Sequence, residues 1–177
     1  MQMIEECRAM RLKILAPNIN ISDYKFTVPD DQNHAIRYGL GAIKGAGEAA
    51  LSSIIAQRQE KGRFTDLFDF CNRIDLRKVS RRLLEPLIKS GALDELGPNP
   101  DKLGRNRAIL LASLENALKQ AERHSKDSAT GQNDIFALPN TQEQSTENKA
   151  PPFVTEIREW PEMERLNAEK ESLGFYL

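Results

Sequence analysis

The chain has 177 residues, 40% of them hydrophobic, which is enough for one packed core with a smaller appendage. Its formal charge of −1 is nearly neutral, and no run of about 18 apolar residues predicts a membrane-spanning helix. Cys7 and Cys71 are too few and too far apart for a disulfide scaffold or a cysteine-rich metal site. No basic-then-apolar targeting pattern precedes the first polar segment, so we expect a cytoplasmic location.

Charge is distributed unevenly along the chain. Residues 1–35 hold 4 Lys or Arg against 5 Asp or Glu, residues 36–107 hold 14 against 9, and residues 108–177 hold 7 against 12. The middle segment therefore has a net charge of +5 and the last segment one of −5. A basic middle segment favours contact with phosphates, although a solvated surface of mixed charge would give the same count.

The first 38 residues predict the end of a helix followed by a small β-hairpin. Residues 1–10 place their apolar side chains on one helical face. Residues 24–28 alternate between apolar and polar side chains, as a strand does. Residues 29–33 have turn chemistry, and residues 35–38 are the candidate partner strand. We expect this hairpin to pack beside the next element and to take no part in chemistry.

The stretch from Tyr38 to Arg58 carries the strongest local signal. Gly45 and Gly47 flank Ala46, which allows a tight turn and keeps side chains away from the backbone. An amphipathic helix follows, with apolar residues at three- and four-residue spacing: Ala49, Ala50, Leu51, Ile54 and Ile55.

This turn has the features of an anion site. The amides of Gly45, Gly47 and Glu48 would be free donors at a helix start, where the helix dipole favours an anion. Lys44 adds a point charge beside them. The arrangement suits a phosphate of duplex DNA, although an ordinary helix-start turn would have the same local residues.

Residues 80–93 predict a second, degenerate hairpin. Ser80 begins a helix over residues 81–89, and Pro86 inside it removes one backbone donor. Lys89 takes the place that Lys44 has in the first hairpin, and Ser90 and Gly91 follow with one glycine instead of two. We therefore expect a weaker DNA contact here. Two such hairpins would hold both strands of a duplex through their phosphates.

The last third of the chain predicts two helices joined by a polar segment. Residues 106–123 form a long amphipathic helix. Residues 125–156 are rich in Ser, Thr, Asn and Gln, which predicts a flexible tether. Pro161 stands at the first turn of a final helix, and Gly174 ends it.

Six short motifs occur in order along the chain, at residues 4–7, 24–28, 40–45, 67–71, 87–92 and 171–177. Together they resemble the alpha subunit of bacterial DNA polymerase III, from the end of its fingers through its clamp-binding region. The glycine turn with its apolar helix likewise resembles the helix-hairpin-helix motif. Where the polymerase family usually has glycine after the first helix, this chain has Arg11.

The resemblance implies a mainly α fold with a small β-hairpin, organised as a tandem helix-hairpin-helix domain with a flexible C-terminal tether. We expect four parts: a fingers-like segment with the hairpin at 1–35, the helix-hairpin-helix domain at 36–124, the tether at 125–156 and the C-terminal helix at 157–177. The residues expected to contact DNA are Lys44, Gly45, Ala46, Gly47, Glu48, Lys89, Ser90 and Gly91.

The tether contains a second candidate site. Gln132, Asp134, Ile135 and Phe136 resemble the pentapeptide that binds a sliding clamp, because Gln precedes Phe by four positions. In that scheme a flexible strand inserts Ile135 and Phe136 into an apolar pocket while Gln132 anchors the approach. A sticky spot in a linker would have the same composition.

The resemblance also implies a function. The intact protein would carry out template-directed DNA synthesis, and this chain would grip duplex DNA and tether the bacterial sliding clamp, with no catalytic residue, cofactor, metal or membrane partner of its own. Other polymerase subunits would bind through regions outside this chain. Two alternatives are a free-standing helix-hairpin-helix glycosylase or nuclease, for which the sequence offers no catalytic pattern, and a helical protein-interaction scaffold that does not bind DNA.

Overall fold

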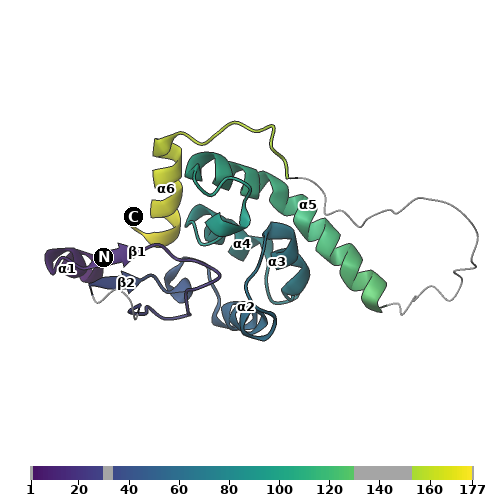
Figure 1. The fold of residues 1–177 in the computed structure, drawn as a ribbon, viewed down its shortest axis with the longest axis horizontal. Coiled ribbons are helices and arrows are strands. Elements are labelled where there is room, and N and C mark those ends of the chain that lie inside the picture. Colours follow the sequence, from purple (N-terminus) through teal and green to yellow (C-terminus); the bar gives the residue numbers. More distant parts are fainter. Residues whose placement is uncertain (1, 30–33, 130–152, 177) are drawn as a thin grey trace, which may run out of the picture.

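The computed structural model describes residues 2–29, 34–129 and 153–176. These residues form a mainly helical fold with a small two-stranded sheet at one end, which confirms the predicted class (Figure 1). In chain order the elements are α1 (Gln2–Ala9), β1 (Lys13–Leu15), β2 (Ala35–Arg37), η1 (Leu40–Ala42), α2 (Glu48–Lys61), α3 (Leu67–Arg73), α4 (Arg81–Lys89), η2 (Asp94–Leu96), α5 (Leu103–Ala129) and α6 (Glu162–Leu173).

The sheet differs from the predicted hairpin. β1 and β2 pair in parallel, with Ile14 opposite Ile36. The expected partner segment, residues 24–28, contributes a single antiparallel bridge between Thr27 and Arg37. Backbone groups of a strand point alternately to its two edges, so β2 bonds to β1 on one edge and to Thr27 on the other. The alternating pattern of residues 24–28 indicated a strand but could not identify the main partner of β2.

The core lies where α2, α3, α4 and α5 meet. Fully buried side chains come from each of these helices, among them Leu51, Ile54, Phe70, Leu84, Ile88 and Ile109. The rings of Phe64 and Phe70 meet edge to face, with centroids 4.9 Å apart. α6 packs beside α4, close to the small sheet (Figure 1). The predicted inward face of α5 is confirmed, since Leu110, Leu114 and Ala117 are all buried.

Acidic side chains start α3. The Asp66 carboxylate accepts hydrogen bonds from the amides of Phe68 and Asp69, at 2.8 and 2.9 Å. The Asp69 carboxylate in turn accepts one from the Thr65 amide at 3.1 Å. Asp66 is therefore the N-cap of α3.

Both described ends of the predicted tether are parts of the fold. Residues 125–129 are the last turn of α5, and residues 153–156 return to the core. Phe153 packs against Phe68 with ring centroids 5.1 Å apart, and the Val154 amide donates to Ser113 Oγ at 2.9 Å. The predicted clamp-binding residues Gln132, Asp134, Ile135 and Phe136 lie outside the described residues.

The helix stop at Gly174 is confirmed, and the stop after α1 is unusual. Gly174 ends α6 in the left-handed conformation with φ +89°. Arg11, which ends α1, also has a positive φ, +57°. The Leu12 amide donates to the Cys7 carbonyl at 2.8 Å, the bond of a Schellman helix end. Arg11 thus adopts the left-handed conformation at the helix end, which glycine adopts with less strain.

Replacing Arg11 with glycine should therefore stabilise the protein. We expect Arg11→Gly to raise the free energy of unfolding by about 0.5–1 kcal/mol, because glycine adopts positive φ without a Cβ penalty. Arg11→Ala is the matched control, since it removes the same exposed side chain but keeps the Cβ. Urea denaturation of both variants measures the difference. Equal stability of the glycine and alanine variants would contradict a strained helix end.

Candidate nucleic-acid interface

The turn of the first predicted helix-hairpin-helix motif is open and lies between η1 and α2. Ile43 is buried and anchors its start, and Gly45 has φ +80°. Gly47 is the N-cap of α2 and makes no side-chain cap. A Cβ built on Gly45 or Gly47 would meet no atom within 4 Å, so both glycines face open space. The turn therefore leaves room for a ligand to approach the backbone.

The turn's amides divide into internal and available donors. The Lys44 amide donates to the Ser172 carbonyl at 2.9 Å, and the Ala46 amide donates to the Ile43 carbonyl at 3.1 Å. Within the described parts of the chain, the amides of Gly45, Gly47 and Glu48 have no such partner. These three amides and the Lys44 side chain lie together on an exposed turn. Ala46, also predicted as a contact, packs inward against the core.

The end of α6 holds this turn in place. Besides the bond from the Lys44 amide, Tyr38 Oη donates to the carbonyls of Ala42 at 3.1 Å and Leu173 at 3.3 Å. The Phe175 ring covers Tyr38 at a centroid distance of 5.6 Å. Burial raises the pKa of the Tyr38 hydroxyl, which keeps it neutral and able to donate. Sequence reasoning did not find this support.

The second turn has a different geometry. Gly91 has φ +85°, its amide donates to the Ile88 carbonyl at 3.0 Å, and the Ala92 amide donates to the Leu87 carbonyl at 3.0 Å. These two bonds form a Schellman end to α4, so its amides are used internally. Ser90 is fully buried and its hydroxyl donates to the Leu87 carbonyl. A Cβ on Gly91 would lie 2.8 Å from the Asp94 carboxylate.

A buried ionic cluster lies behind this second turn. Arg107, 3% exposed, binds both oxygens of Asp94 at 2.8 to 3.1 Å and Glu169 Oε1 at 2.7 Å. Burial lowers the pKa of the Arg107 guanidinium, but the bonds to Asp94 and Glu169 raise it by more, and it lies above its ordinary value. Arg165 adds a second bond to Glu169 at 2.9 Å. The cluster ties η2, α5 and α6 together.

α6 consequently turns a partly polar face to the core. Met163, near its start, is 67% exposed. The buried residues are Ala168, Glu169, Ser172 and Leu173. A charged residue in the buried face has no hydrophobic-pattern signal, and its partners Arg107 and Arg165 explain the burial of Glu169.

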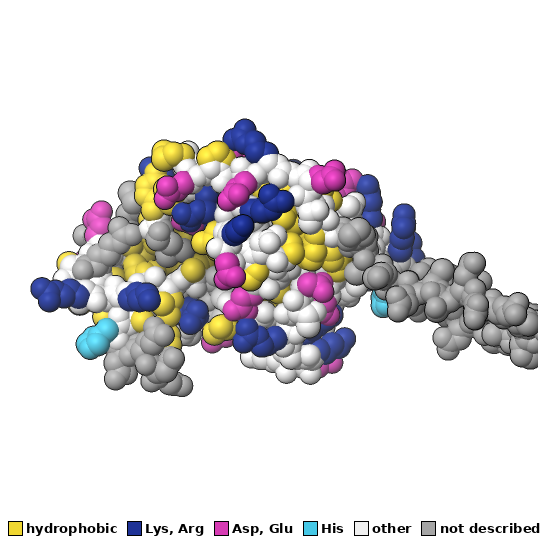
Figure 2. Space-filling model, turned by 45° about the horizontal axis from the view of Figure 1, so that its top comes forward, with side chains coloured by type: hydrophobic (Ala, Val, Ile, Leu, Met, Phe, Trp, Pro, Cys, Tyr) yellow, Lys and Arg dark blue, Asp and Glu magenta, His cyan; other side chains and the backbone are white. Residues whose placement is uncertain are grey.

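Three arginines of the basic middle segment are engaged in the fold and are not free for phosphates. Arg58 donates to the carbonyls of Ile19 and Ser22 and to Asp23, and Arg73 donates to four acceptors and stacks on Phe64. Together with Arg107 they serve the fold. Figure 2 shows lysines and arginines interspersed with acidic side chains on the visible face, without one continuous basic patch. The count of 14 Lys and Arg in residues 36–107 therefore overstates the cations available to DNA, because Arg58, Arg73 and Arg107 are engaged in the fold.

Three further observations concern the described residues. Residues 2–29, 34–129 and 153–176 hold no group of His, Cys, Asp or Glu side chains placed to bind a metal ion. None of the helices in these ranges has both the length and the apolar character that a membrane crossing requires. Cys71 is buried, which raises the pKa of its thiol to about 12 and makes it a poor nucleophile.

The described residues combine an open glycine turn, a long helix that begins there and packed helices that support both. This is the arrangement of a helix-hairpin-helix protein. Residues 11–103, just over half of the chain, match the profile of the helix-hairpin-helix motif family. The chain belongs to this family.

More similar relatives are found among curated proteins. The chain is 45% identical to the DNA polymerase III subunit alpha of Vibrio cholerae over 175 residues, which cover 99% of the chain and 14% of that subunit. The Escherichia coli K12 subunit gives the same values, and the Pseudomonas aeruginosa subunit is 43% identical over 187 residues, 99% of the chain and 15% of the subunit. The resemblance to this subunit is thus confirmed. The chain spans about one seventh of the length of these relatives.

The two glycine turns should respond differently to a methyl group. We expect Gly91→Ala to lower the free energy of unfolding by about 2–4 kcal/mol, because it adds backbone strain and pushes on the buried Asp94–Arg107 pair. Gly47→Ala should cost less than about 1 kcal/mol, since its Cβ meets open space and only the N-cap preference changes. Chemical denaturation of both variants provides the comparison. Similar losses for the two would contradict the assignment of Gly91 to packing.

Proposed function

We propose that this chain binds the phosphate backbone of duplex DNA, without reading base sequence, as part of a replicative DNA polymerase. The observation that carries the proposal is the exposed turn at the start of α2, where the unpartnered amides of Gly45, Gly47 and Glu48 lie beside Lys44. Among the described residues, no atom lies within 4 Å of a Cβ built on Gly45 or Gly47. The names of the relatives support the same context, since each is a DNA polymerase III subunit alpha.

Physical chemistry favours a phosphate as the ligand of this turn. Amides at a helix N-terminus point their N–H groups at an anion, and the dipole of a 14-residue helix such as α2 adds a favourable partial charge. The Lys44 ammonium adds a full charge. Phosphate oxygens are identical at every base pair, so a grip of this kind positions the module on DNA and carries no sequence information.

The wider activity follows as part of the same proposal. The whole protein would carry out template-directed DNA synthesis in the cytoplasm with other polymerase subunits, while this chain contributes DNA grip and no catalytic group or cofactor site. Gln132, Asp134, Ile135 and Phe136, outside the described residues, would bind the bacterial sliding clamp. A weak clamp contact and a weak DNA contact reinforce one another, because holding both partners on one duplex raises their effective concentration.

The DNA grip predicts a sequence-independent loss. Lys44→Glu combined with Gly47→Val should weaken binding at least about tenfold for all duplexes alike, because it replaces the cation and covers the amides. Fluorescence anisotropy on several unrelated duplexes, each over a range of salt concentrations, measures this. The unaltered chain should show a negative slope of log affinity against log salt, which a protein-interaction scaffold would lack.

Lys61→Glu is the matched control for this experiment. It makes the same charge change at the opposite end of α2, on an exposed side chain. We expect it to cost less than about threefold, through the general field alone. An equal loss for Lys61→Glu would mean that net charge and not the turn controls affinity. A loss confined to one duplex would indicate base readout instead.

The clamp contact has its own test. Replacing Gln132, Ile135 and Phe136 with alanine should abolish binding to an immobilised bacterial sliding clamp and leave DNA binding intact. Burying the two apolar side chains gains roughly 3–6 kcal/mol, and ordering each residue of a flexible segment costs about 1–2 kcal/mol, so a micromolar contact is expected.

Alanine at Asn140, Gln142 and Gln144 provides the control for this variant, because those residues lie in the same polar segment. Clamp binding should survive this control replacement. If the first variant instead lowers the melting temperature in circular dichroism while clamp binding is unchanged, Ile135 and Phe136 are core residues and the clamp assignment is wrong.

A further inference from the structure

The end of α6 contacts both glycine turns. Glu171 Oε2 lies 2.8 Å from Lys89 Nζ, at the end of α4. The next residue, Ser172, accepts the hydrogen bond from the Lys44 amide at 2.9 Å. The end of α6 thus contacts Lys89 through the Glu171 carboxylate and Lys44 through the Ser172 carbonyl, and these are the two lysines that the sequence predicts as phosphate contacts.

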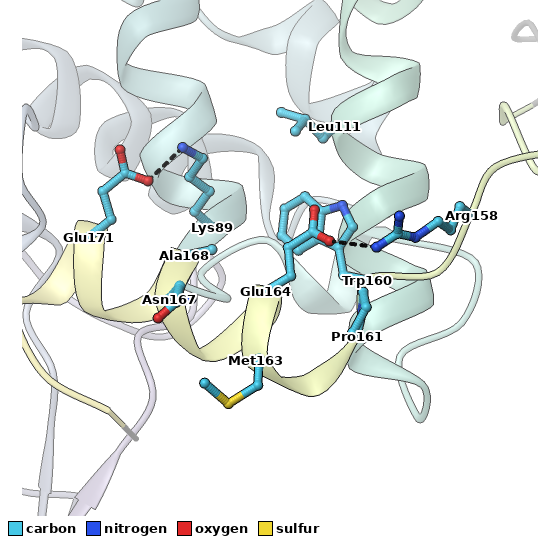
Figure 3. A pocket seen from close by; sticks show the side chains of 10 residues that line it. All are labelled: Lys89, Leu111, Arg158, Trp160, Pro161, Met163, Glu164, Asn167, Ala168 and Glu171. Carbon is cyan, nitrogen blue, oxygen red and sulfur yellow. Dashed lines mark hydrogen bonds and ion pairs between the residues drawn. The ribbon is translucent and has the colours of Figure 1, made fainter.

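This ion pair borders a cavity of about 620 Å³ beside α6. Figure 3 shows Lys89 and Glu171 facing each other at one edge of the cavity, while Arg158 and Glu164 pair at the other edge. In both pairs a glutamate of α6 binds a cation from outside that helix. They differ in that only the first lies next to the hairpin turn.

The Lys89–Glu171 contact can be exchanged for another anion. The Glu171 side chain is 68% exposed and that of Lys89 is 28% exposed, so water reaches the contact and it adds little to stability. The hydrogen bond and charge of Lys89 lower the pKa of the Glu171 carboxyl, and the charge of Lys44 lowers it further. The carboxylate is therefore stabilised mainly by Lys89, as a phosphate placed there would be.

We infer that Glu171 occupies the position of a DNA phosphate and limits the affinity of this module by neutralising Lys89. The inference rests on the proposed function, since it concerns the same DNA-binding face. In the unaltered chain Lys44 contacts DNA and Lys89 is occupied by Glu171. Removing the carboxylate makes Lys89 available as a second phosphate contact without changing the backbone, because the Lys89 carbonyl stays bonded to Arg107.

The test compares two glutamates of α6 in the 177-residue chain. Glu171→Gln should bind a fluorescent 20-base-pair duplex about three- to tenfold more tightly at low salt, and its log–log salt slope should become more negative by about 0.9, the value for one added phosphate contact. Glu164→Gln makes the same net-charge change and frees Arg158 in the same way. It should change affinity less than about twofold.

A double-mutant cycle assigns the effect to Lys89. Lys89→Ala should leave affinity within about twofold in the unaltered chain, and should remove the gain of Glu171→Gln when the two are combined. Circular dichroism should report the same fold for each variant.

Several results would overturn the inference alone. They are an unchanged affinity for Glu171→Gln, an equal gain for Glu164→Gln, and equal losses for Lys89→Ala in both backgrounds. If the unaltered chain binds duplex and Lys44→Glu weakens it, the proposed function stands whatever the Glu171 result. An unaltered chain that does not bind duplex would overturn both.

Discussion

The buried guanidinium of Arg107 is the constraint on which the rest of this structure depends. The guanidinium can be buried only because the carboxylates of Asp94 and Glu169 neutralise it, with N–O distances of 2.8 and 2.7 Å. Losing one partner would leave an uncompensated buried charge, which typically costs about 3–5 kcal/mol. Because Glu169 belongs to α6, the cluster draws that helix onto α4 and α5. The carbonyl of Ser172 and the carboxylate of Glu171 come into place as a consequence.

Three positive-φ or cap glycines illustrate how one residue type serves two purposes in this fold. Gly91 makes close packing possible, since its missing Cβ leaves room for Arg107 and Asp94. Gly45 and Gly47 leave room for a ligand, because the space beside them is open. The distinction is invisible in the chain itself, where both turns are a lysine followed closely by glycine. This difference in the space beside the glycines decides which turn is suited to bind a phosphate.

The sequence predicted the structural features that depend on residues close together in the chain. The start of α2 after Gly47, the inward face of α5 and the stop of α6 at Gly174 all follow from helix periodicity and glycine conformation. Contacts between distant residues could not be predicted in the same way. The parallel pairing of β1 with β2, the burial of Glu169 and the use of Arg58 and Arg73 inside the fold each require a partner that only the structure supplies. The lysine-to-glycine similarity of the second turn was misleading for that reason, because Gly91 packs against Arg107 and Asp94 and Ser90 is buried.

In the proposed function, the backbone of the first turn binds the phosphate. Nuclear magnetic resonance of the ¹⁵N-labelled chain, titrated with an unlabelled duplex, observes those amides directly. The account predicts that the largest shifts fall on the amides of Gly45, Gly47 and Glu48, that they are the same for unrelated duplexes, and that Ser90 and Gly91 hardly move. Unshifted amides at Gly45 and Gly47 at a duplex concentration that saturates binding would contradict it.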